Sequence, residues 1–287
     1  MALRFLVVEG NRRTERETHR RSFGTAYAES YSAAVLRHAP DAAIDVAHPA
    51  DEGANLPDAD GLSGYDGVFL TGSALNLYDM TPEVTRQIDL MRAVYASGTP
   101  AFGSCWGIQV GAAAAGGSVA KNPAGREIGF ARRITPTETG RAHPMLSGRP
   151  VAYDAPAVHL DVVESVPDGA TILAANRMTG VQAAEIRHDG GVFWGVQYHP
   201  EFSLAELAAI LARYDERLVA EGFCADLAAA HAYAADIRAL HDDPARPDLA
   251  WRHGLDAEVL DPFKRTREIA NFIEALVIPT KAARGRA

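Results

Sequence analysis

Cysteine is scarce in this 287-residue chain, where only Cys105 and Cys224 occur. Two cysteines are too few for a secreted scaffold held by disulfide bonds, so we expect a reducing, cytoplasmic setting. Long apolar runs are missing as well. None approaches the ~20 residues that a membrane span needs, and the N-terminus lacks the apolar region of a signal peptide. We therefore expect no membrane partner.

Basic residues are outnumbered, with 28 Lys and Arg against 37 Asp and Glu, which gives a formal net charge of −9. This balance argues against nucleic acid as the main partner, because phosphate binding draws on clustered basic side chains. The chain also has no glycine-rich phosphate loop of the G-x-x-x-x-G-K-[ST] or G-x-G-x-x-G type, and no Cys and His cluster with metal-ligand spacing. We expect no metal and no cofactor.

Short apolar runs alternate with helical patterns in the first part of the chain. The expected strands are residues 5–8, 43–47, 67–70 and 100–103. Their continuous hydrophobicity is typical of strands buried on both faces of a parallel sheet. Helical patterns over 25–38 and 82–96 separate them, and Glu9, Arg12 and Arg13 are expected in a solvated loop. This order predicts an α/β fold with a doubly wound, mostly parallel central sheet and flanking helices.

The second part of the chain changes in character twice. Residues 149–201 are strand-rich, and a glycine-containing turn predicts a hairpin over 183–198. From Leu204 the chain is mainly helical, with a last helix expected over 264–275 and a frayed basic tail over 281–287. We predict one domain over residues 1–203 and a helical C-terminal extension over 204–287, packed on or beside it. The extension is compatible with a homodimer face or with a lid.

Cys105 lies in the sequence Gly-Ser-Cys-Trp-Gly, directly after a predicted buried strand and before a helix-like run. This G-x-C-x-G pattern is the thiol counterpart of the G-x-S-x-G nucleophile elbow, whose sharp turn leaves room only for glycine on either side. A helix N-terminus beneath the thiol favours the thiolate. The alternative is a buried cysteine that only packs at a strand end. Cys224 lies in an Ala-rich helical stretch and is expected to be inert.

A thiol nucleophile needs a base and donors for an oxyanion. His199 ends a predicted strand in the sequence Val-Gln-Tyr-His-Pro-Glu, so that it could act as the base while Glu201 orients its ring. A hydrogen-bonded core histidine is the alternative for His199 alone. Gly72 and Ser73 follow the strand before the elbow strand, and their small side chains would let the backbone approach a substrate beside Cys105.

Taken together, these motifs resemble those of the class I (triad-type) glutamine amidotransferases, the glutaminase module also found in GMP synthase and in stand-alone homologues. The matching segments are FGSCWGIQ at 102–109, VQYHPE at 196–201, TGSALNLYD at 71–79, and two weaker blocks at 122–129 and 157–163. In the last block Val158 stands where the family pattern has serine. The resemblance covers about residues 1–203.

The resemblance implies a catalytic triad. Cys105 would attack the side-chain amide carbon of glutamine and form a γ-glutamyl thioester, which releases ammonia. His199 would act first as general base and then as general acid, and Glu201 would fix its tautomer.

The resemblance also implies how the substrate is held. Backbone N–H groups of Gly72 or Ser73 and of Trp106 would bind the oxyanion. Gln109, and the backbone around His159 and Leu160, would contact the glutamine substrate. Tyr78 would help to shape the mouth of the pocket. The resemblance thus implies Cys105, His199 and Glu201 for catalysis and Gly72, Ser73 and Trp106 for the oxyanion. For the substrate it implies Gln109, His159, Leu160 and Tyr78.

Two enzymatic hypotheses share this triad. The first is a glutaminase that supplies ammonia to a separate synthetase subunit, because the residues after Glu201 are too few for a synthetase domain. The second is a γ-glutamyl hydrolase, which uses water to cleave γ-glutamylated amines or peptides. A third hypothesis is a catalytically silent scaffolding homologue. The intact Cys105, His199 and Glu201 argue against it.

Overall fold

The computed structural model describes residues 2–285 of the chain. The strands are β1 (Arg4–Val8), β2 (Ala43–Ala47), β3 (Gly67–Leu70), β4 (Ala101–Ser104), β5 (Ser118–Lys121), β6 (Glu127–Pro136), β7 (Tyr153–His159), β8 (Asp161–Ser165), β9 (Ala170–Ala175), β10 (Ala183–His188) and β11 (Gly191–Val196). Nine of them form one sheet in the order β2-β1-β3-β4-β11-β10-β9-β6-β7, and β5 pairs with β8.

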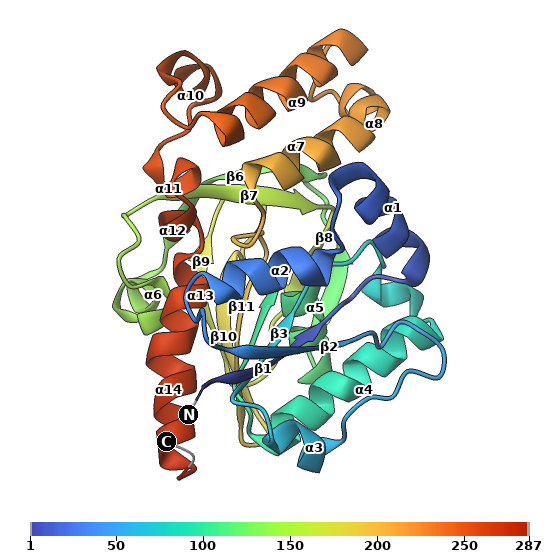
Figure 1. Cartoon of the computed structure of the whole chain (residues 1–287), viewed down its shortest axis with the longest axis vertical. Coiled ribbons are helices and arrows are strands. Elements are labelled where there is room, and N and C mark those ends of the chain that lie inside the picture. The colour runs from blue at the N-terminus through green and yellow to red at the C-terminus, as the bar shows by residue number, and fades with distance from the viewer. Residues whose placement is uncertain (1, 286–287) are drawn as a thin grey trace.

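This sheet is mixed, which confirms the predicted α/β class (Figure 1). Neighbouring strands from β2 to β11 run parallel, whereas those from β11 to β7 run antiparallel. The predicted hairpin is β10–β11, and Asp189 and Gly190 turn it with positive φ angles.

Helices cover both faces of the sheet. They are α1 (Arg13–Phe23), α2 (Tyr27–Leu36), α3 (Ala59–Ser63), η1 (Leu77–Asp79), α4 (Pro82–Ser97), α5 (Trp106–Ala114), α6 (Glu138–Ala142), η2 (Pro144–Leu146), α7 (Leu204–Arg213), α8 (Asp215–Ala220), α9 (Leu227–Asp242), α10 (Pro247–His253), α11 (Ala257–Leu260), α12 (Pro262–Arg265), α13 (Arg267–Phe272), the π-helical turn η3 (Ile273–Val277) and α14 (Ile278–Ala283). Within residues 2–285, no helix is both long and apolar enough to cross a membrane.

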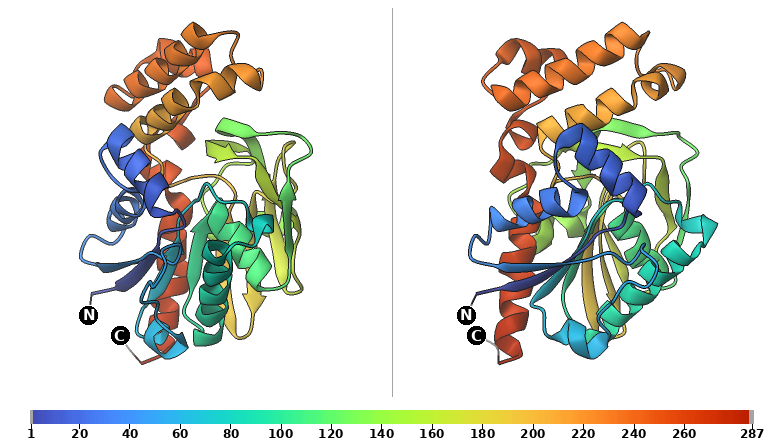
Figure 2. Two further views of the ribbon diagram at one scale, coloured as in Figure 1. Left: turned by 90° about the vertical axis from the view of Figure 1, so that its right-hand side faces the viewer. Right: turned by 45° about the vertical axis from the view of Figure 1, so that its right-hand side comes forward.

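Strand β1 shows why the apolar runs are continuous. Phe5 and Val7 pack on one face of the sheet with α2 and α13, while Leu6 and Val8 pack on the other with α4 and α5. Successive strand residues point to opposite faces, so burial on both faces requires every position to be apolar. A third apolar cluster joins β6 to α7 and α9, and the α7–α10 layer lies over one end of the molecule (Figure 2).

The C-terminal segment differs from the frayed tail that the sequence predicts. Lys281 is 9% exposed and forms an ion pair with Asp66, with 3.1 Å between Nζ and Oδ2. Arg284 donates hydrogen bonds to Thr99 and to the carbonyl of Ser97. The prediction is therefore wrong for the described part, and residues 286 and 287 lie outside it.

The last helix also runs further than the predicted 264–275, because it continues through α13, η3 and α14. Pro279 has no N–H to donate inside a helix, and the wider π-helical turn η3 lies directly before it. α13 and η3 pack into the same apolar cluster as β1. The boundary at residue 203 stays a prediction.

The segment after β1 is helical rather than a solvated loop. Arg13 begins α1, and Arg16 of this helix forms an ion pair with Asp51 at 2.7 Å. Glu9 is completely buried and accepts hydrogen bonds from the N–H groups of Asn11 and Ala28. The expectation of a solvated loop is therefore wrong for the buried Glu9 and for the helical Arg13, although Arg12 and Arg13 are exposed to solvent as expected. Helix α1 has almost no apolar stripe and is held largely by polar contacts.

Candidate active site

Three neighbouring parallel strands bring the predicted catalytic segments together. Val196 of β11 pairs with Ser104 of β4, and Leu70 of β3 pairs with Gly103 of β4. Because all three strands end at the same edge of the sheet, the chain that follows each strand meets the others there. Cys105, Gly72 and His199 therefore line one small cavity.

The turn at Cys105 has the geometry of a nucleophile elbow. Cys105 adopts φ 54° and ψ −102°, a conformation that costs a residue with a side chain on the order of 1–3 kcal/mol. A side-chain carbon on Gly103 would lie 2.8 Å from the backbone of Gly107, and one on Gly107 would lie 2.8 Å from the carbonyl oxygen of Leu70. The two flanking glycines are thus sterically required, as the sequence pattern predicts.

His199 is held from three sides. Its Nδ1 lies 2.7 Å from Oε1 of Glu201, its ring stacks on Phe202 with centroids 4.0 Å apart, and its backbone N–H donates to the carbonyl of Pro156. A carboxylate at Nδ1 fixes the proton on that nitrogen and leaves Nε2 for the thiol. Both His199 and Glu201 are buried.

The charges around His199 favour its protonated form. Burial alone would lower the pKa of His199, but the charges of Glu201 and Cys105 and the hydrogen bonds with both raise it to about 10. A base held beside a cysteine is what nucleophilic catalysis by a thiol requires. The pair is the electrostatic arrangement expected of a cysteine hydrolase.

Backbone donors are free beside the thiol. Throughout residues 2–285, no acceptor pairs with the N–H groups of Gly72, Ser73 or Trp106. Asn11, which the sequence reasoning missed, holds this loop by donating to the carbonyl of Gly72 and accepting from the N–H of Ala74. The free N–H groups suit the predicted oxyanion site.

The buried side chains of His19 on α1 and Glu206 on α7 meet at 2.9 Å. Arg213 faces the other ring nitrogen of His19 at 3.1 Å, and because a guanidinium cannot accept, that nitrogen carries no proton. Burial, helped by Arg213, lowers the pKa of His19 to about 4. Burial, helped by the charge of Glu201, raises the pKa of Glu206 to about 8. A neutral carboxyl group therefore lies near Glu201 at neutral pH.

A second cavity of about 260 Å³ opens on the other side of Cys105. Gln109, His159 and Leu160 line it, and their contact with a substrate stays a prediction. The Gln109 amide nitrogen donates to the carbonyl of Asp161, 3.0 Å away. Tyr78 is not among the residues that line either cavity and reaches the region through its hydroxyl, which donates to Asp161 at 3.3 Å.

The C-terminal helices supply cavity residues that carry no sequence motif. Ile210 and Tyr214 line the small cavity, and Tyr214 and Arg217 line the larger one. Arg126 and Asp161, which fall in or near the two weaker motif blocks, also line the larger cavity. Only the folded chain reveals the helical contributors, because their role depends on how α7 and α8 pack over the strand ends.

The sequence is similar to a known protein family and to curated relatives. The glutamine amidotransferase class-I family model matches residues 28–214. A curated relative from Pseudomonas sp., named gamma-glutamyl-L-1-hydroxyisopropylamide hydrolase, is 34% identical over 286 residues, which cover 97% of this chain and 94% of the relative. The glutamine-hydrolysing GMP synthase of Leifsonia xyli subsp. xyli is 34% identical over 141 residues, which cover 49% of this chain and 26% of that protein. The match thus spans about a quarter of the GMP synthase.

Among solved structures, a glutamine amido transferase from Methylobacillus flagellatus superimposes with a TM-score of 0.62 at 20% identity. The superposition covers 94% of this chain and 93% of that one. At this level of identity the likeness concerns the fold alone.

Proposed function

Because the chain belongs to the class-I glutamine amidotransferase family, we propose that this enzyme hydrolyses γ-glutamyl amides of small amines. Cys105 is the proposed nucleophile, His199 the acid and base, and Glu201 the residue that orients the imidazole. The products are glutamate and the free amine.

The proposed reaction has two halves. The Cys105 thiolate attacks the γ-carbonyl carbon, and the oxyanion accepts hydrogen bonds from N–H groups of Gly72 or Ser73 and Trp106. The C–N bond then breaks while the His199 imidazolium gives its proton to the departing amine. In the second half, His199 takes a proton from water, the hydroxide oxygen attacks the thioester carbon, and glutamate leaves as the C–S bond breaks.

The larger cavity suits the glutamyl end of the substrate. The Arg217 guanidinium lies over the Tyr214 ring at 4.9 Å and has no carboxylate partner among residues 2–285, so it is available to an α-carboxylate. Arg126 is already paired with Glu221 at 2.9 Å. The Asp161 carboxyl group on the same wall can accept from the α-ammonium group.

The observation that carries the proposal is the character of the cavity on the His199 side of Cys105. It measures about 50 Å³, and its walls include Tyr27, Phe202, Ile210 and Tyr214. The polar Asn11, Ser73 and His199 also line the cavity. The apolar part of the wall would stabilise an alkyl group on the departing amine, whereas ammonia gains nothing from it. The volume admits only a small amine. The Pseudomonas relative, whose name gives a γ-glutamyl amide of a small amino alcohol as its substrate, supports the same reading.

A second candidate is a glutaminase that delivers ammonia to a separate synthetase subunit. The similarity to the GMP synthases favours it, because those proteins are named as glutamine-hydrolysing. In that case glutamine itself occupies the larger cavity and the small cavity holds only the departing ammonia.

Steady-state kinetics separates the two candidates. Amine release from γ-glutamyl isopropylamide and ammonia release from glutamine are measured with wild type, Cys105→Ala and Tyr214→Ala. We expect kcat/KM for the alkylamide to exceed that for glutamine by at least tenfold, Tyr214→Ala to shrink this preference, and Cys105→Ala to abolish both reactions. Faster turnover of glutamine, in the isolated chain or after a co-purifying synthetase is added, contradicts the first candidate.

A further inference from the structure

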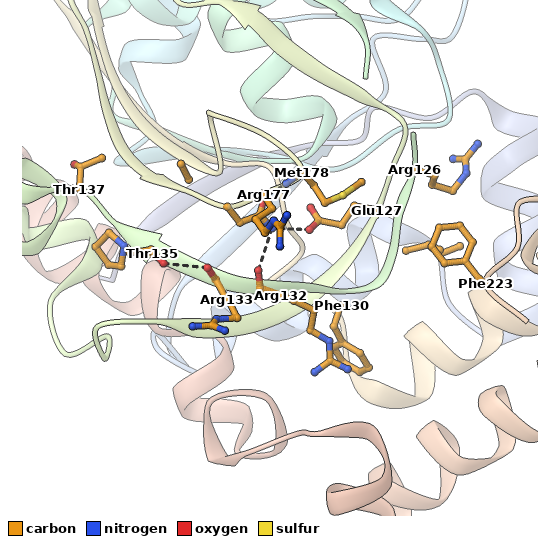
Figure 3. A pocket seen from close by; sticks show the side chains of 14 residues that line it. Arg126, Glu127, Phe130, Arg132, Arg133, Thr135, Thr137, Arg177, Met178 and Phe223 are labelled. Carbon is orange, nitrogen blue, oxygen red and sulfur yellow. Dashed lines mark hydrogen bonds between the residues drawn. The ribbon is translucent and has the colours of Figure 1, made fainter. Parts of the chain in front are cut away.

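A cavity of about 890 Å³ lies next to the substrate cavity and shares only Arg126 with it (Figure 3). Strand β6, the loop after β9 and the residue Phe223 after α8 form its walls. None of the proposed triad residues lines it. Its size falls within the ~300–1,000 Å³ of small-molecule sites, and such sites combine apolar walls with a few placed polar groups.

The cavity is basic in a chain whose net charge is −9. Its lining contains the arginines 126, 132, 133 and 177 and the single carboxylate of Glu127. Glu127 is already engaged, because it accepts hydrogen bonds from His159, Asn176 and Gln182 at 2.6–2.8 Å. Both of its carboxylate oxygens are thus occupied by neighbouring side chains.

Only two of the four arginines have carboxylate partners. Arg126 pairs with Glu221 at 2.9 Å, and Arg132 pairs with Asp154 at 2.7 Å. The guanidinium groups of Arg133 and Arg177 make no hydrogen bond or ion pair with any residue in the range 2–285. These two exposed arginines thus have no direct ionic partner at the wall of the cavity.

The backbone at Arg133 is strained and anchored. Arg133 has φ 52°, an unfavourable angle for a residue with a side chain, and its N–H donates to Oδ1 of Asp154 at 2.7 Å. The same carboxylate binds Arg132, whose guanidinium lies 5.2 Å above the Phe130 ring. The root of the Arg133 side chain is thereby fixed on the cavity wall, and backbone strain of this kind is often found at ligand sites.

The apolar part of the lining is partly open to solvent. Phe223 is 46% exposed, and Met178 also lines the cavity (Figure 3). Phenylalanine and methionine side chains make favourable contacts with flat rings. Guanidinium groups bind carboxylates through a planar pair of hydrogen bonds.

We propose that this cavity is a second ligand site, which binds a planar organic carboxylate. The apolar body lies against Phe223 and Met178, and the carboxylate faces Arg133 and Arg177. This site goes beyond the hydrolysis proposed above and does not depend on it.

Calorimetric titration of the whole chain with 1-naphthoate tests the site, with the uncharged 1-naphthamide as the matched ligand. The main variant is Arg133→Asn/Arg177→Gln, because asparagine tolerates the positive φ at position 133. We expect saturable 1:1 binding of naphthoate, at least tenfold weaker binding of naphthamide, and at least tenfold weaker binding of naphthoate by the double variant. Phe223→Ala should weaken both ligands.

The control is Arg238→Gln, which removes one charge from an exposed ion pair with Asp242 on α9 and should leave naphthoate binding unchanged. Hydrolytic activity of the double variant serves as the check that the chain is folded. Naphthoate binding that is absent up to millimolar concentration, equal in the double variant, or no stronger than that of naphthamide overturns the proposal.

Discussion

Replacement of Gly72 by alanine tests the position of the catalytic imidazole. A side-chain carbon at residue 72 would lie 2.6 Å from Cε1 of His199, whereas ordinary contacts between carbon atoms are ~3.5–4.0 Å. The imidazole is fixed by Glu201 on one side and stacked on Phe202 on another. The new methyl group must therefore displace either the ring or the loop by about 1 Å.

The size of the expected effect follows from this displacement. A misplacement of ~1 Å at a catalytic group costs on the order of 10²-fold in rate, which corresponds to about 3 kcal/mol in the barrier. Alanine keeps the backbone N–H at position 72, and the φ of Gly72 does not lie in the left-handed region. The substitution therefore changes the geometry at His199 without deleting a donor or straining the backbone.

The assay is steady-state turnover of γ-glutamyl isopropylamide, accompanied by thermal unfolding. Gly72→Ala should lower kcat about 100-fold while KM and the cooperativity of unfolding change little. Gly180→Ala is the matched control, because nothing lies within 4 Å of a side-chain carbon built there. A Gly72→Ala variant with at least half of the wild-type kcat would refute the assigned position of His199 during catalysis.

Three further outcomes are expected. Glu201→Gln removes the charge that supports the His199 imidazolium and should therefore lower kcat on the order of 10²- to 10⁴-fold. The basic limb of the kcat/KM profile, which is set by the raised pKa of His199, should also move to lower pH. A basic limb at the same pH in wild type and variant contradicts this. Arg217→Gln should raise KM ~10–100-fold with kcat nearly unchanged, because one charge-assisted hydrogen bond is lost; an unchanged KM removes Arg217 from the substrate site. Between pH 6.5 and 8, Glu206 keeps its proton in the folded chain, whereas the same residue has lost it in the unfolded chain. The free energy of unfolding should therefore fall as the pH rises across this range, by up to about 2 kcal/mol. Urea unfolding of Glu206→Gln should lack this loss, and an identical slope in wild type and variant argues against a buried neutral Glu206.

The parts that the sequence predicts well are those with local causes. The elbow at Cys105 needs glycines at 103 and 107 for steric reasons that hold within a few residues, and the apolar strand runs follow from burial on both faces of the sheet. Because β3, β4 and β11 end at the same edge of the sheet, the strand order alone then places His199 near Cys105.

The parts that the sequence does not reveal depend on distant partners. Arg217 and Tyr214 come from helices without any motif, and only the packing of those helices over the strand ends gives them a place in the cavities. Lys281 belongs to a basic tail by composition, yet Asp66, more than 200 residues earlier, makes it part of the folded chain. The burial of Glu9 cannot be predicted from the sequence either. The N–H groups that offset the loss of hydration of its carboxyl group come from Asn11 in the following turn and Ala28 in α2.

The central claim is that Cys105 forms a covalent γ-glutamyl thioester, and acid quenching of the working enzyme tests it most directly. Wild-type protein mixed with excess γ-glutamyl isopropylamide is quenched within the first turnovers, digested at low pH and analysed by mass spectrometry. The account predicts a γ-glutamyl adduct on the peptide that contains Cys105, and none on the peptide that contains Cys224 or in Cys105→Ala. Undiminished hydrolysis by Cys105→Ala, or an adduct on another residue, would contradict it.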